Sequence, residues 1–69
     1  MENEIIFAVE DSLEGGYEAK AIGHSIYTEA DSFDELKINI REAVAAHFET
    51  DDMPKLIRIH YVKEEVIAA

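Results

Sequence analysis

The chain has 69 residues, no cysteine and a formal net charge of −10 at pH 7. This length predicts one domain, residues 1–69, whose small core has no disulfide or cysteine-bound zinc to support it. We therefore expect extra burial in a homo-oligomer, either a dimer or a tetramer. No apolar run is long enough to span a bilayer, and the start, Met1-Glu2-Asn3-Glu4, lacks the basic residues of a signal peptide. These features predict a cytoplasmic protein without membrane contact.

The negative charge is concentrated in the first half of the chain. Residues 1–36 hold ten acidic side chains and one basic one, whereas residues 37–63 hold four acidic and five basic ones. The first half would repel a phosphate backbone, which argues against direct nucleic-acid binding. It would attract a basic protein partner. The alternative interpretation is that the acidic surface only keeps the protein soluble.

Three strands are expected before residue 30. The segment Glu4–Glu10 is apolar at its centre on both faces, which predicts a strand that is covered on both sides. A turn follows at Asp11–Gly16, where Gly15 and Gly16 supply positive φ angles for a hairpin. Alternation from Tyr17 to Ile22 predicts the second strand, and a tight turn at Gly23 leads to a third at 25–29.

A helix and a last strand complete the order. Ser32 and Glu35 match a capping box, and apolar residues recur at helical spacing from Phe33 until the helix ends near 49–50. His47 lies on this stripe and is expected to pack there. Residues 55–63 alternate as the last strand, and the tail from Glu64 to Ala69 has no clear pattern. The prediction is an α+β domain of order β-β-β-α-β, with an antiparallel-rich sheet and one helix on one face.

At this point the chain resembles the HicB-like antitoxin family. The resemblance covers roughly residues 4–63 and is carried by the turn Asp11–Gly16, by Gly16-Tyr17-Glu18-Ala19, by Gly23, and by Asp31–Leu36 leading to Arg41-Glu42-Ala43. It implies a partial RNase H-like fold. It also implies a non-enzymatic role: binding and neutralising a small basic ribonuclease toxin of the HicA type, which cleaves mRNA.

Full antitoxins of that family usually continue into a DNA-binding segment. The present sequence ends just after the last strand, so it resembles a stand-alone member that lacks that segment. The alternative to an antitoxin is therefore a solitary homo-oligomeric adaptor with another partner.

Catalytic chemistry is not indicated. RNase H enzymes need several carboxylates that converge on metal ions, and here the acids near the first hairpin are better explained as solvated turn residues. The three histidines lack the short spacing of a metal site. We therefore expect no enzyme activity, catalytic residue, cofactor or metal. A residual nuclease, lost in Asp11→Asn, is the remaining alternative.

The candidate residues fall into four sets. One helix cannot cover both faces of the sheet, so the second face is expected to be used for contact. The interface candidates on this second face are Ile6, Ala8 and Ile26. Tyr17 and Tyr27 are candidates for the same interface or for the core, and Ile38 is a candidate on the side of the helix opposite its apolar stripe. The candidate acidic residues that face a partner are Glu10, Asp11, Glu14 and Glu18. The turn glycines are Gly15, Gly16 and Gly23, and the helix cap is Ser32 with Glu35.

Overall fold

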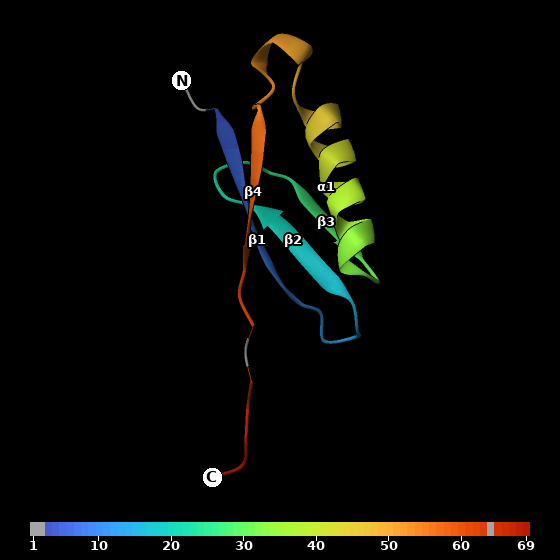
Figure 1. The fold of residues 1–69 in the computed structure, drawn as a ribbon, viewed down its shortest axis with the longest axis vertical. Coiled ribbons are helices and arrows are strands. Elements are labelled where there is room, and N and C mark those ends of the chain that lie inside the picture. The colour runs from blue at the N-terminus through green and yellow to red at the C-terminus, as the bar shows by residue number, and fades with distance from the viewer. Residues whose placement is uncertain (1–2, 64) are drawn as a thin grey trace.

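The computed structural model describes residues 3–63 and 65–69. Its elements are β1 (Glu4–Asp11), β2 (Tyr17–Ala21), β3 (Tyr27–Ala30), α1 (Phe33–His47), a short 3₁₀ turn η1 (Thr50–Asp52) and β4 (Leu56–Tyr61). Figure 1 shows α1 along one side of the sheet, and the segment after β4 extending away from the body. The predicted α+β class and element order are confirmed. The predicted domain also includes residues 1, 2 and 64, which lie outside the described residues.

The four strands form one mixed sheet in the order β3-β2-β1-β4. β1 pairs antiparallel with β2, and β2 pairs antiparallel with β3, so the sheet is rich in antiparallel pairs, as predicted. β4 pairs parallel with β1 because α1 returns the chain to the end of the sheet where β1 starts. The helix thus lies on one face, and the other face carries no element among residues 3–63 and 65–69.

The first hairpin depends on its glycines. Gly15 and Gly16 have φ angles of +96° and +79°, as predicted for the turn, and Gly23 has +86°. Gly16 is also required sterically, since a Cβ placed there would lie 2.5 Å from the backbone oxygen of Ala30. The hairpin therefore packs directly against the end of β3.

The helix begins where the capping pattern predicts. Ser32 Oγ accepts a hydrogen bond from the Glu35 backbone N–H at 3.1 Å, which satisfies one of the unpaired donors of the first turn. Leu36, Ile40 and Val44 are buried at successive turns of α1. Asn39 Nδ2 donates to the backbone oxygen of Glu29 at 3.0 Å, which fixes the helix against β3.

The core lies between α1 and one face of the sheet. Phe7 and Leu36 are completely buried, and Ile40 and Val9 are 1% exposed. The other core residues are Ile5, Ala19, Ala21, Ile26 and Val44. In β4, Ile57 and Ile59 pack against this core, although both remain half-buried.

One interface candidate requires correction. Ile26 is 6% exposed and belongs to the core, so it is not a contact residue of the uncovered face. The register explains this result. Tyr27 lies opposite Lys20 on the uncovered face, so the preceding residue must point to the helix side. The backbone oxygen of Ile26 also accepts the N–H of Ala21 at 3.0 Å, which closes the loop ahead of β3.

Three predicted boundaries shift by a few residues. β3 starts at Tyr27, two residues later than expected, and α1 ends at His47, with Phe48 as its C-cap. β4 covers Leu56–Tyr61, which is shorter than the predicted 55–63. His47 is exposed in the last helical turn, so the expectation that it packs in the apolar stripe is wrong. No helix within the described part of the chain has the length and apolar character needed to cross a membrane.

Candidate protein-binding face

The sheet face opposite α1, called here the open face, is solvent-accessible. The side chains on it follow from the strand registers and the alternation of each strand. They are Glu4, Ile6, Ala8 and Glu10 of β1; Glu18 and Lys20 of β2; Tyr27 and Glu29 of β3; and Leu56, Arg58 and His60 of β4, with Ile22 and Val62 directly beyond the strands.

Three glutamates form a row across this face. Glu10 lies directly opposite Glu18 on the neighbouring strand, and Glu18 lies directly opposite Glu29 on the next one. Like charges in such positions destabilise a sheet, because cross-strand side chains are only about 5 Å apart. None of the described Lys or Arg side chains forms an ion pair with the row, and its one hydrogen bond comes from the Tyr27 hydroxyl to Glu29 Oε2 at 3.2 Å. The row therefore concentrates negative charge without compensation inside the described chain.

The other end of the open face is apolar. Ile6 and Ile22 are neighbours across β1 and β2, where the Ile22 N–H donates to the Ile6 oxygen at 2.9 Å. Ile22 is 58% exposed and Leu56 is 61% exposed. Together with Ala8 these side chains make an accessible apolar area, in which Ala8 lies two residues from Glu10 along β1 and Ile6 lies four residues from it. An apolar area bordered by charge is typical of protein contact surfaces.

Basic groups separate the two ends of the face. Lys20 pairs in register with Ala8, and His60 lies opposite Ala8 on the other side. Arg58 Nε donates to Glu4 Oε2 at 3.0 Å, so this guanidinium is already partnered at the apolar end. His60 and Arg58 share this exposed face of β4.

An aromatic cluster closes the hairpin end of the core, on the helix side of the sheet. The rings of Tyr17, Phe33 and Tyr61 lie 5.6–5.9 Å apart between centroids. The Tyr61 hydroxyl donates to Asp11 Oδ1 at 2.6 Å. This hydrogen bond is the main reason that the pKa of Tyr61 is raised to about 12, with smaller contributions from burial and the Asp11 charge.

A second ring cluster lies at the C-terminal end of α1. The His24 ring is 5.8 Å from that of His47 and 5.1 Å from that of Phe48, in edge-to-face orientations. Within residues 3–63 and 65–69, no group of three or more His, Asp or Glu side chains is placed to hold a metal ion. The cluster joins the loop after β2 to the helix end.

The structure separates the predicted contact residues. Ile6, Ala8 and Tyr27 lie on the open face, where Tyr27 is 54% exposed. Tyr17 is half-buried on the helix side, in contact with Phe33. Ile38 is 52% exposed on the outer surface of α1, away from the open face. The structure therefore brings three of the six candidates to one surface.

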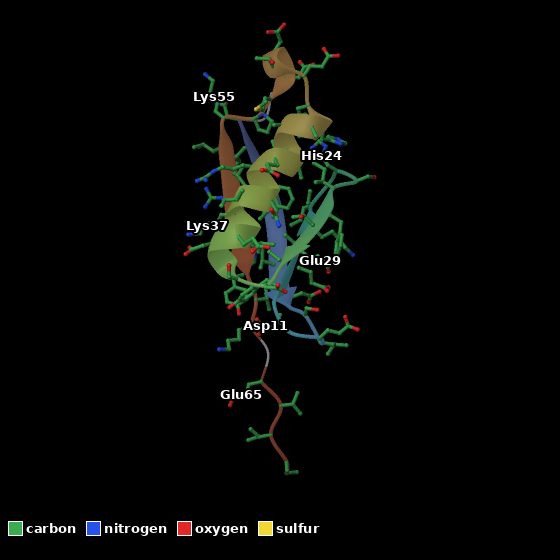
Figure 2. All side chains as sticks on the ribbon, turned by 90° about the vertical axis from the view of Figure 1, so that its right-hand side faces the viewer. Asp11, His24, Glu29, Lys37, Lys55 and Glu65 are labelled. Carbon is green, nitrogen blue, oxygen red and sulfur yellow. The ribbon has the colours of Figure 1, made fainter. Side chains whose placement is uncertain are left out.

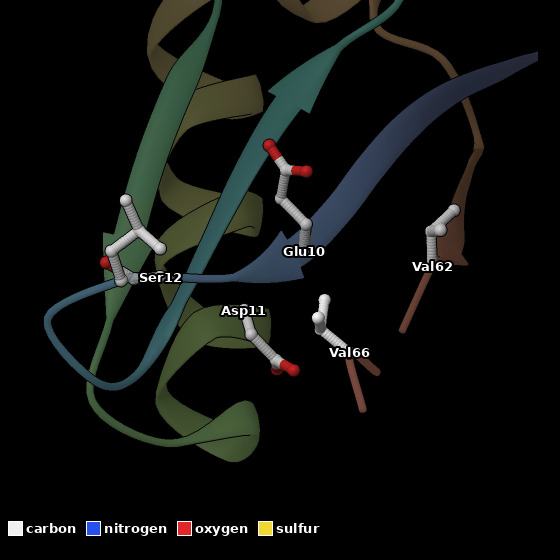
Figure 3. Close-up of a pocket in the computed structure, with 6 residues that line it drawn as sticks. Glu10, Asp11, Ser12, Val62 and Val66 are labelled. Atoms are coloured by element: carbon white, nitrogen blue, oxygen red, sulfur yellow. The ribbon is translucent and has the colours of Figure 1, made fainter. Parts of the chain in front are cut away.

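The acidic candidates divide in the same way. Glu10 and Glu18 form part of the row on the open face. Asp11 points to the helix side and is held by Tyr61, while Glu14 is exposed in the hairpin turn. Figure 3 shows Glu10 and Asp11 pointing to different sides of a shallow hollow of about 220 Å³ that Val62 and Val66 also line. These carboxylates therefore do not converge on one point, as two-metal chemistry would need.

Sequence reasoning missed two residues of the face. Glu29 completes the row, and Leu56 extends the apolar end. The alternation of β3 placed Glu29 on the same side as Tyr27, but its alignment with Glu18 depends on the strand register, which a single sequence does not reveal.

No family model matches the chain, and no solved structure matches it significantly. A UPF0150 protein of Archaeoglobus fulgidus is 50% identical over 52 residues, which cover 75% of this chain and 77% of the relative. A UPF0150 protein of Thermotoga maritima is 37% identical over 67 residues, which cover 97% of this chain and 94% of the relative. The chain therefore belongs to the UPF0150 family.

Proposed function

We propose that this protein is a non-enzymatic binding module that uses its open face to hold a basic protein. One observation carries the proposal: the row of Glu10, Glu18 and Glu29, side by side on three neighbouring strands without a cation from the described chain. Such a row lowers the stability of the isolated domain. Cationic side chains of a partner would remove this repulsion, so the cost is recovered only in a complex.

The partner we propose is a small basic toxin of the HicA type, which makes the protein a HicB-like antitoxin. The support is the resemblance of residues 4–63 to that family, together with the charge of −10. A ribonuclease holds RNA phosphates with Lys and Arg side chains. The glutamate row would occupy those cations and compete with the RNA, while Ile6, Ile22 and Tyr27 would supply apolar contact. The partial RNase H-like fold implied by the resemblance belongs to the same proposal.

Co-expression tests this function. A HicA-type toxin is expressed with the wild-type protein, with Glu10→Lys/Glu18→Lys/Glu29→Lys, or with the control Glu42→Lys/Glu49→Lys/Asp51→Lys. The control makes the same change of charge at exposed positions on α1 and in the segment that follows it. Growth arrest is expected to be relieved by the wild type and the control and not by the row variant. Relief by the row variant, or none by the wild type, would contradict the proposal.

The second candidate is a solitary homo-oligomeric adaptor. The accessible apolar end of the open face favours it, because Ile22 and Leu56 are each more than half exposed. An adaptor predicts a stable homo-oligomer and no effect on toxin activity. Neither candidate involves direct nucleic-acid binding, because the glutamate row repels phosphate.

A further inference from the structure

The helix leaves a groove beside β4. α1 packs on β3 and β2, and its offset leaves Ile57 and Ile59 half-buried. A hollow of about 350 Å³ between α1 and β4 has an apolar floor of Ile40, Ile57 and Ile59 and is bordered by Lys37, Arg41 and Lys55. We call this hollow the cationic groove. Figure 2 shows Lys37 and Lys55 on the β4 side of the molecule and Glu29 on the opposite side.

The cations of the groove are available to a partner. Among the described residues, no carboxylate lies within ion-pair distance of Arg41 or Lys55. Lys37 makes a long contact of 3.9 Å to Asp34, and its Nζ lies 5.3 Å from the centroid of the Phe33 ring. An acidic segment with apolar side chains is therefore the complementary occupant. A neutral apolar ligand would leave the three positive charges without partners.

The free edge of β4 also restricts which kind of segment can occupy the groove. β4 is an outer strand of the sheet and pairs only with β1 in the described part of the chain. Its outer N–H and C=O groups can accept another strand, and Leu56–Tyr61 contains no proline or bulge that would prevent pairing. The groove and the edge together fit an extended acidic strand.

The tail of the chain has a matching composition, with the acidic Glu65 followed by the apolar Val66 and Ile67. Residues 65–69 form neither helix nor strand, and Val66 and Ile67 are 94% and 80% exposed. The tail continues away from the body beyond β4 (Figure 1), at the end of the strand opposite to Lys55. A return onto its own groove would need a tight turn, and the sequence Val62-Lys63-Glu64-Glu65-Val66 has no Gly, Asn, Asp or Pro to form one.

We propose that the tail of a second copy lies along the outer edge of β4 and that two chains exchange tails reciprocally. In an extended strand Glu65 and Ile67 share one side and Val66 takes the other. Glu65 then meets the cations of the groove, Ile67 covers its apolar floor, and Val66 lies beside the exposed Leu56 on the open face. This inference does not depend on the proposed toxin partner, and the glutamate row on β1, β2 and β3 remains accessible.

Light scattering on the sized protein tests the exchange. The wild type is expected to have twice the 7.8 kDa mass of one chain. Ile67→Asp is expected to raise the dimer Kd by about tenfold or more. The control Leu13→Asp introduces the same charge at a fully exposed leucine of the hairpin turn and should leave the dimer unchanged. A monomeric wild type, or an equal dimer in Ile67→Asp, would overturn the proposal.

Exchanging the charges of Arg41 and Glu65 tests the electrostatic contact between the tail and the cationic groove without changing the core. Arg41→Glu should weaken the dimer, and Arg41→Glu combined with Glu65→Arg should restore it at low salt. An unchanged Kd in Arg41→Glu, or a double variant no tighter than the single one, would contradict the contact between the tail and the cationic groove.

Cross-linking identifies the occupant. Because the sequence has no cysteine, Ile57→Cys and Ile67→Cys proteins can be prepared separately and mixed under mild oxidation. The expected product is a disulfide between the two different chains, well above that from Ile57→Cys mixed with Leu13→Cys. A chain carrying both substitutions that forms its disulfide internally as a monomer would show that the tail folds onto its own groove, and would overturn the exchange.

Discussion

The two sides of this small sheet are built differently. On the β3 side, α1 covers the sheet, Ala19 and Ala21 are buried, and Asn39 fixes the helix to the strand. On the β4 side, which α1 covers less, the larger apolar side chains of Ile57 and Ile59 are only half-buried. Both outer strands, β3 and β4, have an unpaired edge in the described chain. A single helix of 15 residues is not wide enough to close a four-stranded sheet. The helix therefore covers the β2 and β3 side more completely than the β4 side, and the open face carries no other element of the described chain.

The largest expected effect is a difference in stability between a variant on the covered side of the sheet and a variant on the β4 side. Leu36→Ala removes a completely buried side chain of the covered side and should lower the free energy of unfolding by about 2–5 kcal/mol. Ile57→Ala on the β4 side removes a half-buried side chain and should cost about half as much or less. Urea unfolding of both variants checks the comparison. An equal loss would show that the β4 side is as well packed as the β3 side.

The hairpin supports the covered side, and its two glycines should respond unequally. Gly16→Ala combines positive φ with a clash against the Ala30 backbone and should cost more than about 2 kcal/mol. Gly15→Ala has the same type of φ but open space around it, so it should cost about 1 kcal/mol. Thermal unfolding of the two variants tests the difference. A Gly16→Ala protein as stable as Gly15→Ala would refute the close approach to β3.

The cap of α1 should have an intermediate effect. Ser32→Ala removes the acceptor of the Glu35 N–H and should cost about 1 kcal/mol. Ser32→Asp keeps an acceptor at the same place, so its free energy of unfolding should differ from that of the wild type by only about 0.3 kcal/mol. Circular dichroism during urea unfolding measures both. A loss in Ser32→Asp as large as that in Ser32→Ala would show that the cap is not the cause.

Much of the fold follows from local signals. The alternation of β1 and β2, the glycine turn and the Ser32 cap depend on neighbours in sequence, and they were predicted to within a few residues. The error at Ile26 and the missed Glu29 have a different cause, because both positions depend on which residues of β2 and β3 lie opposite each other. The lateral offset of α1 also depends on tertiary packing, so the cationic groove beside β4 has no signature in one sequence.

The open face should behave as a surface that is not optimised for stability. Glu18→Gln removes the central charge of the row and should raise the free energy of unfolding by about 0.2–1 kcal/mol at low salt. The gain should shrink at high salt, because exposed charges are screened. Glu42→Gln on the exposed side of α1 serves as the control and should change stability less. A destabilised Glu18→Gln protein would show that the row has an internal cation partner.

The smallest effect concerns the hairpin end of the core at high pH. The raised pKa of Tyr61, about 12, means that the folded state keeps a proton that the unfolded state releases near pH 10. The associated stability is fully present below pH 10 and is lost as the pH rises from 10 to 12. Asp11→Asn removes the charged acceptor and should bring the pKa of Tyr61 down, as measured by the ultraviolet absorbance of tyrosinate. An unchanged titration curve would contradict the role of Asp11.

The most direct test of the proposed function is the affinity for the basic partner measured by calorimetry. The purified HicA-type toxin is titrated with the wild type, with Glu10→Gln/Glu18→Gln/Glu29→Gln, and with the control Glu42→Gln/Glu49→Gln/Asp51→Asn. We predict that the row variant binds about tenfold more weakly or worse, that the control matches the wild type, and that the difference falls as salt is added. Equal affinities for the row variant and the control would contradict the assignment of the glutamate row as the partner-binding surface.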